Sequence, residues 1–357
     1  MRRIIWVLLS IFLSGSLLTG CGKRIVSIGE MSSDFNTIEI TDSYAGTTVT
    51  LDESQSQELY GKLKQMEFRK DKPSEKEAEN SAGQGSPALY TLRFLKGSRE
   101  LNQFAIINEN TIVYDGYYYE SKSEQFDTEY LMSFFYQVFR AEVIENNGGL
   151  LVAPEEGSDA YRSSDKIMVG LTDTLILDQE GKEMTADQLK PGDILRIAFN
   201  GVILESYPAQ ITADRVEYLE HNLLLDGYLA LIDDIYQIDS GLNSEITMLA
   251  FDTSEWVNLT ESEKEIILSV AKAKYGLETL QGTFDELAEQ GLIDKRNLYF
   301  EEGILIELKD MKYDEKKGTI TCAISKWRSG LGAIGADAKA SYKEGVWKIT
   351  KNNEWIS

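Results

Sequence analysis

The side chains that most often carry catalysis or bind metals are scarce in this chain of 357 residues. It holds one histidine, His221, and two cysteines, Cys21 and Cys322. A structural zinc site needs about four Cys or His ligands, a catalytic zinc site is usually rich in His, and iron–sulfur clusters need several Cys. We therefore expect neither kind of metal centre, and the sequence predicts no cofactor.

His221 is the only histidine that could act as a general base. The sequence lacks the Gly-x-Ser-x-Gly motif that presents the nucleophile of many hydrolases. A catalytic triad would have to assemble around a histidine at a predicted domain boundary. We expect a structural or solvent-exposed role for His221, and no catalytic residue is predicted.

Carboxylates are the commonest reactive groups, with 59 Asp and Glu residues. Adjacent pairs such as Asp233–Asp234, Glu301–Glu302 and Glu155–Glu156 are expected by chance at this frequency. A glycosidase needs two carboxylates that face each other across a cleft, and adjacent residues on a helix do not face each other. The acidic segment Asp178–Glu180 does not match the calcium-binding EF-hand loop, so a hairpin turn is expected there.

A glycine-rich motif near the C-terminus, Gly330-Leu331-Gly332-Ala333-Ile334-Gly335, formally matches the dinucleotide-binding pattern. That pattern requires the loop to open a helix within a unit of roughly 30 residues, whereas the remaining chain is short and predicts a hairpin. We expect a glycine-rich loop between strands. The flanking Trp327 and Arg328 are candidate ligand-contact residues.

A run of three tyrosines, Tyr117 to Tyr119, lies in a predicted strand. Because side chains alternate between the two faces of a strand, either Tyr118 or the pair Tyr117 and Tyr119 is expected to be exposed. Exposed tyrosines often anchor protein and ligand contacts. Tyr118 is therefore a third candidate contact residue.

The N-terminus has the features of a secretory signal. Arg2 and Arg3 precede an apolar stretch that serine and glycine interrupt, and the stretch is shorter than the ~20 residues of a membrane span, which is the alternative interpretation. Leu18-Thr19-Gly20-Cys21 resembles the lipobox of bacterial lipoproteins. The resemblance implies that residues 1–21 are a lipoprotein signal peptide, that Cys21 is lipidated, and that the chain is anchored to the outer face of the cell membrane.

Lipidation of Cys21 would leave Cys322 without a disulfide partner within the chain. The segment around Cys322 predicts a strand, so this residue is expected to be a buried apolar side chain. The formal charge of −23 opposes binding to nucleic acid, which requires a basic surface. Removal of Arg2 and Arg3 with the leader would make the exported chain two units more negative.

The remaining sequence predicts a multidomain α+β protein that begins after a tether at residues 22–36. A first small antiparallel α+β domain is expected over residues 37–140. It includes a helix with Asp52 as N-cap and a last helix that Asp127 caps and that runs through Phe139.

Residues 141–158 are expected to be a linker, because Asn146-Asn147-Gly148-Gly149 and Pro154–Ser158 are rich in turn-forming residues. Residues 159–219 are expected to form a small OB-like β-barrel, since about five short strands fit between turn signals in this segment.

Two motifs in that segment carry a family resemblance. Leu189-Lys190-Pro191-Gly192-Asp193, followed by Gly201-Val202-Ile203-Leu204-Glu205-Ser206-Tyr207-Pro208-Ala209-Gln210, resembles the YobA-like domain. This is an uncharacterised, OB-like β domain of exported proteins from Gram-positive bacteria. The resemblance implies a small barrel on a lipoprotein and implies no activity.

A second α+β domain is expected over residues 221–357. Its helices come first, with capping boxes at Thr260–Glu263 and Thr283–Glu286, and four strands follow from Gly303 to Thr350. A curled antiparallel sheet is expected. The order of elements loosely resembles the cystatin- and NTF2-like folds, in which a helix packs into a bent sheet.

These features favour a membrane-anchored binding, sensing or envelope-interaction module without enzymatic activity. Its expected partners are the membrane, through the lipid on Cys21, and an envelope protein or glycan. The alternatives are an envelope hydrolase that acts through carboxylates and an accessory subunit of a membrane complex.

Overall fold

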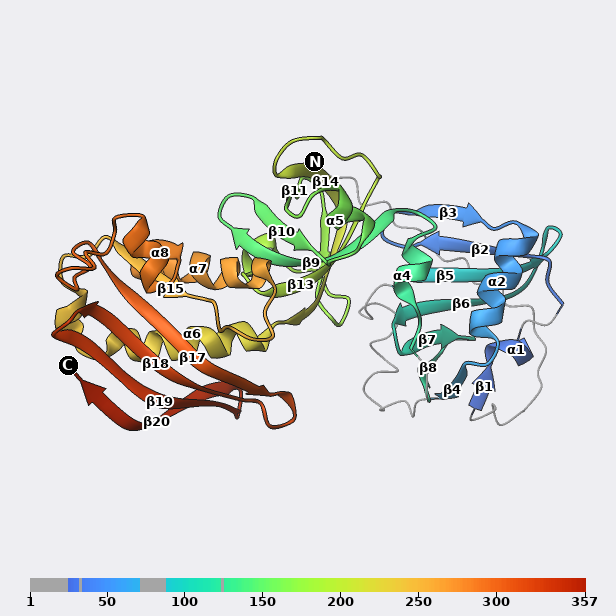
Figure 1. Cartoon of the computed structure of the whole chain (residues 1–357). Coiled ribbons are helices and arrows are strands. Elements are labelled where there is room, and N and C mark those ends of the chain that lie inside the picture. Colours follow the sequence, from blue (N-terminus) through green and yellow to red (C-terminus); the bar gives the residue numbers. More distant parts are fainter. Residues whose placement is uncertain (1–24, 32–33, 71–87, 123–124) are drawn as a thin grey trace. The chain divides into compact units, whose positions relative to one another are not determined.

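The computed structural model describes residues 25–31, 34–70, 88–122 and 125–357, and the chain divides into two compact units, Met1–Asp127 and Thr128–Ser357 (Figure 1). Each unit combines helices with predominantly antiparallel β-sheet, which confirms the α+β prediction. No helix within the described ranges is long and apolar enough to cross a membrane.

The first unit is built on one antiparallel sheet with the strand order β1-β4-β8-β7-β6-β5-β2-β3. Apolar side chains alternate along its central strands, and helix α2 (Glu53–Leu63) buries Leu59 and Leu63. The strands are β1 (Ile25–Ser27), β2 (Thr37–Asp42), β3 (Thr47–Thr50), β4 (Glu67–Lys70), β5 (Tyr90–Lys96), β6 (Arg99–Asn108), β7 (Thr111–Tyr114) and β8 (Tyr117–Ser121).

Helix α2 begins where the sequence predicts, because Asp52 and Gln55 form a capping box. The prediction of a tether at 22–36 is wrong for its described part. β1 pairs with β4, and the short helix α1 (Ile28–Met31) follows it. Ile28 is fully buried, so apolar contacts hold this segment on the first unit. The sequence does not predict this, because the segment is short and its apolar residues follow no sustained helix or strand periodicity.

The second unit begins with helix α4 (Thr128–Met132) and a five-stranded barrel. Strands pair in the closed order β9–β10–β11–β14–β13–β9, in which only β11 and β14 run parallel, and β12 adds to β14. This is the OB-like arrangement that the sequence predicts. The strands are β9 (Gln137–Asn146), β10 (Leu150–Pro154), β11 (Ile167–Gly170), β12 (Leu175–Leu177), β13 (Asp193–Phe199) and β14 (Ala209–His221).

The predicted start of this barrel is wrong. The helix expected to continue through Phe139 ends at Met132, and the linker expected at 141–158 holds most of β9, all of β10 and a short helix cap at Ser158. From Gln137 onward the apolar residues alternate, and Phe139 points into the barrel. The turn residues that suggested a linker form the β9–β10 hairpin, where Gly148 has a positive φ of 81°.

The C-terminal part wraps a curled sheet around helix α6 (Leu223–Gln237). The sheet order is β16-β15-β17-β18-β19-β20, with β15 parallel to both of its neighbours and the remaining pairs antiparallel. The elements are β15 (Met248–Asp252), α7 (Glu261–Tyr275), β16 (Glu278–Gln281), α8 (Phe284–Glu289), β17 (Gly303–Asp314), β18 (Thr319–Ser329), β19 (Gly332–Lys343) and β20 (Val346–Ile356).

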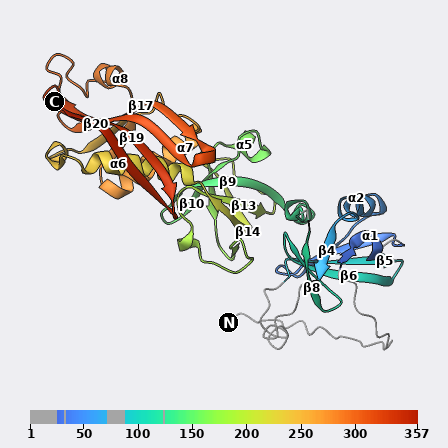
Figure 2. The same cartoon turned by 90° about the horizontal axis from the view of Figure 1, so that it is seen from below.

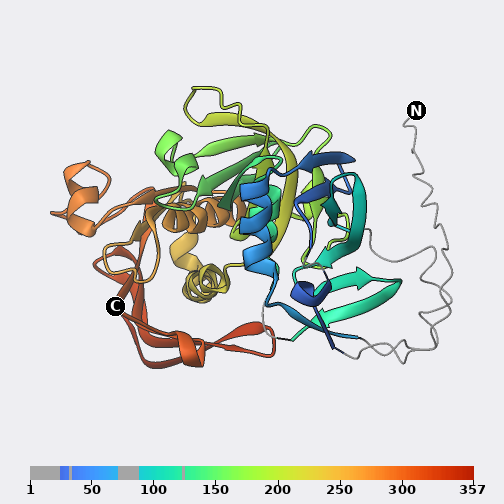
Figure 3. The same ribbon diagram turned by 90° about the vertical axis from the view of Figure 1, so that its right-hand side faces the viewer.

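The four last strands and both predicted capping boxes are confirmed, whereas the parallel strands β15 and β16 make the sheet mixed. Helix α6 contacts β18, β19 and β20 and lies beside β19 and β20 in Figure 2. Figure 3 shows this helix (yellow) end-on beside the strands of the C-terminal sheet (red). Helix α7 packs beside α6 and against β9 of the barrel. The outward-facing Ile144 and Ala153 of the barrel therefore belong to the same apolar core as α6 and α7.

Candidate functional site

The lipobox residues Leu18, Thr19, Gly20 and Cys21 lie outside the described residues, so their assignment stays a prediction. The other predicted contact residues lie in two different units. Tyr118 is in β8 of the first unit, and Trp327 and Arg328 are in β18 of the second.

Trp327 and Arg328 contact other residues of the C-terminal part of the chain. The Trp327 ring packs edge-on against Phe284, with 5.1 Å between ring centroids. The Arg328 guanidinium donates hydrogen bonds to the carbonyl oxygens of Leu242 at 3.0 Å and Ser244 at 2.7 Å. The Arg328 hydrogen bonds connect β18 to the segment after α6, and both side chains, which stay partly exposed, make their main contacts within the protein.

The tyrosine run is exposed in a different pattern from strict alternation. Tyr117 and Tyr118 are both exposed, and Tyr119 is buried. Lys70 lies over the Tyr117 ring, 2.9 Å from its centroid, so that one exposed tyrosine already has a cationic neighbour. Tyr118 remains an accessible aromatic side chain in the first unit.

The glycine-rich motif forms a tight β18–β19 hairpin, with its last glycines inside β19. An added Cβ at Gly335 would lie 2.5 Å from the Trp355 ring, so glycine is needed there for close packing against β20. This confirms a connection between strands at Gly330–Leu331 and gives the motif a packing role. Cys322 is buried in β18, as predicted, and burial raises the pKa of its thiol to about 12.

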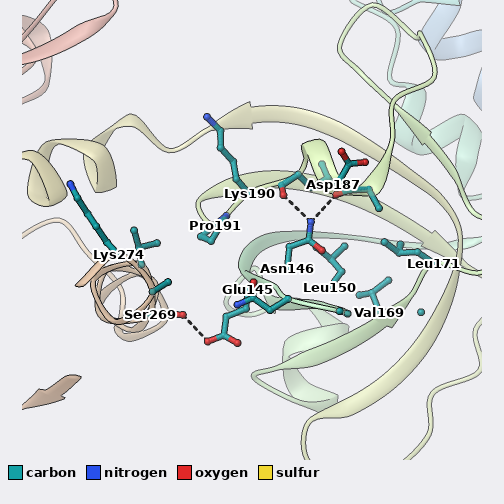
Figure 4. A pocket seen from close by; sticks show the side chains of 18 residues that line it. Glu145, Asn146, Leu150, Val169, Leu171, Asp187, Lys190, Pro191, Ser269 and Lys274 are labelled. Carbon is teal, nitrogen blue, oxygen red and sulfur yellow. Dashed lines mark hydrogen bonds between the residues drawn. The ribbon is translucent and has the colours of Figure 1, made fainter. Parts of the chain in front are cut away.

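A pocket of about 900 Å³ lies between one rim of the barrel and α7 (Figure 4). The β9–β10 hairpin, the end of β11 and the segment before β13 form the barrel side. Most of the wall is apolar. Its apolar side chains include Leu150, Val169, Leu171, Leu189, Pro191 and Val270. Cavities of roughly 300–1,000 Å³ with mainly apolar walls are typical of small-molecule sites.

Hydrogen bonds hold the barrel side of this pocket in place. Asn146 Nδ2 donates to the carbonyl oxygens of Ala186 at 2.7 Å and Leu189 at 2.8 Å (Figure 4). Asp193 Oδ2 accepts from the backbone N–H of Lys190, which closes the turn that presents Lys190 and Pro191 to the pocket. Two side chains, Asn146 of β9 and Asp193 of β13, therefore hold the turns on the barrel side of the pocket.

The polar groups around the pocket carry both signs of charge. On α7, Ser269 donates to Glu145 Oε1 at 2.6 Å, and Lys274 pairs with Asp233 at 2.8 Å. Lys190 is exposed, and within the described ranges its ammonium group has no hydrogen-bond or ion-pair partner. An apolar chamber with an unpaired cation at its rim suits a ligand that has an apolar body and a polar end.

A second, smaller pocket of about 490 Å³ lies along the same seam between β9 and α7. Its lining includes Glu142, Glu263 and Asn222. Burial raises the pKa of Glu142 to about 7, the charge of Glu263 adds to this rise, and the hydrogen bond from Asn222 and the charge of His221 oppose it. A carboxyl group that is half protonated near neutral pH is a suitable proton donor or acceptor.

His221 lies close to this pocket and has a structural environment, as the sequence predicts. Its Nδ1 is 2.8 Å from Asp193 Oδ1, and its Nε2 is 3.2 Å from Asp226 Oδ2. The hydrogen bonds to Asp193 and then Asp226 raise the pKa of His221 to about 9, against the effect of burial. The protonated ring therefore joins β13 to α6.

Sequence reasoning missed both pockets because their walls come from distant segments. The local signals were visible, since Asn147–Gly149 and Lys190–Asp193 are turn motifs at the rim of the larger pocket. Periodicity alone does not show that α7 faces these turns.

Comparison with known proteins adds no relative. No family model, no curated protein and no solved structure matches this chain.

Proposed function

We propose that this protein is a lipid-anchored, extracytoplasmic binding module that holds a small molecule between its barrel and α7. The observation that carries the proposal is the pocket of about 900 Å³ with apolar walls. Its walls come from two parts of one compact unit. Preformed, mainly apolar pockets with a few polar groups are the usual form of a small-molecule site.

The polar groups narrow the class of ligand. Asn146 and Glu145 are occupied by internal hydrogen bonds, so they shape the pocket more than they recognise a ligand. Lys190 is the cation at the rim that has no partner within the described residues. The site fits an amphipathic molecule whose apolar body fills the chamber and whose polar or anionic end lies near Lys190.

The proposed lipid anchor at Cys21 would determine where in the cell this site binds its ligand. The lipobox-like sequence that ends at Cys21 and the basic residues before it support export and lipidation. The charge of the chain supports a body that stands off an anionic membrane surface. In this setting the protein would bind its ligand outside the cytoplasm.

A binding experiment with the neutral dye Nile red tests the pocket. Ala273 lies on its α7 wall, and Ala273→Trp would fill part of the chamber. Wild-type protein is expected to enhance the dye's fluorescence saturably, and Ala273→Trp to weaken binding about tenfold or more. Ala45→Trp, which adds the same ring at an exposed turn of the first unit, is the control and should bind as wild type does. Equal binding by the two variants would overturn the assignment.

A carboxylate-dependent hydrolase remains the second candidate, favoured by one observation. Glu142 and Glu263 lie in the same pocket, and the pKa of Glu142 is raised to about 7. Incubation of purified envelope glycan with wild type and Glu142→Gln tests it. Product released by wild type and lost in the variant would support hydrolysis, and no product from either would exclude envelope glycan as a substrate.

A further inference from the structure

Asn222 connects three elements through one side chain. Its Oδ1 accepts the backbone N–H of Leu224 at 3.2 Å and so caps α6. Its Nδ2 donates to Glu142 Oε1 on β9 at 3.1 Å and to Glu263 Oε1 on α7 at 2.6 Å. The barrel, α6 and α7 therefore meet at one amide group.

The two carboxyl groups on this amide repel each other when both are ionised. Two carboxylates that share a site cannot both ionise at the usual pH, so one of them keeps its proton to a higher pH. Glu263 is fixed by the capping box of α7, in which it accepts the backbone N–H of Thr260. Glu142 takes no part in such a cap, and burial raises its pKa, so it is the group expected to hold the proton.

Other charged groups also face this site, and they come from every element around it. His221 at the end of β14 is the nearby cation, and it is held by Asp193 of β13 and Asp226 of α6. The lining of the pocket also includes charged residues from β9 and from the segment after β10. These are Arg140, Glu155 and Glu156. Acidic groups outnumber basic ones, so the surroundings do not neutralise a second negative charge on the pair.

The seam between β9 and α7 continues from this pair to the larger pocket. Glu145 lies three residues after Glu142 on β9. Its carboxylate accepts a hydrogen bond from the hydroxyl of Ser269, which follows Glu263 on α7. Both Glu145 and Ser269 line the larger pocket (Figure 4). Movement of α7 away from β9 at Glu142 would therefore loosen the wall of the proposed ligand site.

We propose that a proton held by Glu142 beside Glu263 keeps the seam between β9 and α7 closed, and that loss of this proton opens the seam and releases the ligand from the larger pocket. The release rests on the proposed binding function, whereas the opening of the seam does not. The groups involved are the amide of Asn222, the carboxyl groups of Glu142 and Glu263, and helix α7, which lines both pockets.

The direction of the pH effect follows from the two states of Glu142. In the closed seam burial raises the pKa of Glu142 from 4.5 to about 7, and in an open, solvated seam its pKa would return toward 4.5. The closed state thus binds more protons between these values, so opening increases as pH rises from 4.5 to 7 and levels off above. His221 contributes at most about a factor of two up to pH 6.5, because even an imidazole with the ordinary pKa is at least half protonated there.

Hydrogen exchange of the full chain at pH 5.0 and 6.5 tests the seam. After correction for the intrinsic exchange rate, amides of α7 and β9 should open roughly tenfold more often at pH 6.5, the effect of about one pKa unit. Glu142→Gln mimics the protonated acid and should remove this difference. Glu155→Gln changes a glutamate of the same pocket that is not among the hydrogen-bond partners of Asn222, and it should keep the difference.

A second variant guards against a failure of Glu142→Gln to fold. Glu263→Gln preserves the capping box, because glutamine also serves at that position. It removes the charge of Glu263 but leaves the burial of Glu142, so it should reduce the pH difference without removing it. A wild-type seam that opens equally at both pH values would overturn the proposal. A pH difference as large in Glu142→Gln, or in Glu263→Gln, as in wild type would overturn it as well.

The release of Nile red separates this proposal from the binding function. Its dissociation rate should be roughly tenfold higher at pH 6.5 than at pH 5.0 in wild type and unchanged by pH in Glu142→Gln. If the dye does not bind at either pH while the seam opens as expected, the binding function fails and the seam stands. If the dye binds but dissociates equally fast at both pH values, the link between seam and pocket is wrong.

Discussion

The hydroxyl group of Ser269 on α7 donates a hydrogen bond to the carboxylate of Glu145 on β9, with 2.6 Å between Oγ and Oε1. This bond crosses the seam between the barrel and the C-terminal helices at the edge of the larger pocket. It joins parts of the chain that are 124 residues apart. A hydrogen bond to a charged acceptor is stronger than one between neutral groups, so it contributes to the position of α7.

We predict that Ser269→Ala destabilises the second unit by about 1–2 kcal/mol, the usual effect of removing a hydrogen bond to a charged group in a partly buried place. Urea unfolding of the full chain, followed by fluorescence, measures this change. Ser262→Ala removes from the same helix a hydroxyl that makes no side-chain hydrogen bond to any described residue, and it should change stability by less than about 0.5 kcal/mol. Equal effects of the two variants would contradict the role given to Ser269.

A buried lysine sets a second prediction. Lys326 of β18 is fully buried, and its ammonium group donates to the carbonyl oxygens of Tyr236 at 3.0 Å and Asp239 at 3.2 Å and to Asn243 Oδ1 at 2.9 Å. It thereby provides hydrogen bonds to carbonyl groups at and just after the C-terminal end of α6. Its positive charge also interacts favourably with the negative end of the helix dipole. Burial lowers the pKa of Lys326 to about 8, which leaves it protonated at neutral pH.

Lys326→Met keeps the length of the side chain and removes every donor, so we expect a loss of about 3 kcal/mol in the free energy of unfolding. Lys309→Met, which removes a half-exposed lysine that pairs with Glu307 on the same sheet, is the control. Its effect should stay within about 1 kcal/mol. Thermal and urea unfolding measure both, and a wild-type stability for Lys326→Met would contradict the capping role.

The charge on His221 predicts a pH dependence of stability. Its pKa rises from 6.5 unfolded to about 9 folded, mainly through the hydrogen bond to Asp193. The folded state then binds the proton more tightly, so the stabilisation is complete below pH 6.5 and is lost as pH rises to 9. We expect a decrease of about 1–2 kcal/mol over this range, and His221→Gln should flatten that part of the curve. An unchanged slope in the variant would assign the titration to another group.

The proposed anchor is tested at Cys21. Cys21→Ala removes the thiol that would carry the lipid, so the variant should be released from the membrane or remain as an uncleaved precursor. Metabolic labelling with a fatty acid and fractionation of the cells measure this. A variant that is still cleaved, labelled and retained in the membrane would contradict the lipobox assignment.

The fold could be predicted in large part where a local signal was complete. Capping boxes fixed the starts of α2, α7 and α8, and alternation of apolar residues fixed β17 to β20. The sequence predicts that an OB-like barrel is present, but it does not predict the first two strands of the barrel, which look like the end of a helix and a linker. Phe134, Phe135, Val138 and Phe139 have helical spacing, and only closure of the barrel by β9 on β13 favours a strand from Gln137 onward.

The candidate site was harder to predict than the fold. Trp327 and Arg328 lie beside a conspicuous glycine motif, yet their contacts are internal. The residues that form the pocket are ordinary apolar side chains and turn residues, whose meaning depends on α7 lying against the barrel. In the same way, Glu142 is one of 59 acidic residues until Asn222 places it beside Glu263.

Native mass spectrometry of the protein extracted from its own membranes tests the central claim most directly, because it detects a ligand that the protein has bound in the cell. Wild type is expected to carry a small amphipathic molecule, which Ala273→Trp should lack and Ala45→Trp should retain. Wild-type protein that is ligand-free at pH 5.0, where the seam is expected to be closed, or a ligand that is equally present in Ala273→Trp, would contradict the account.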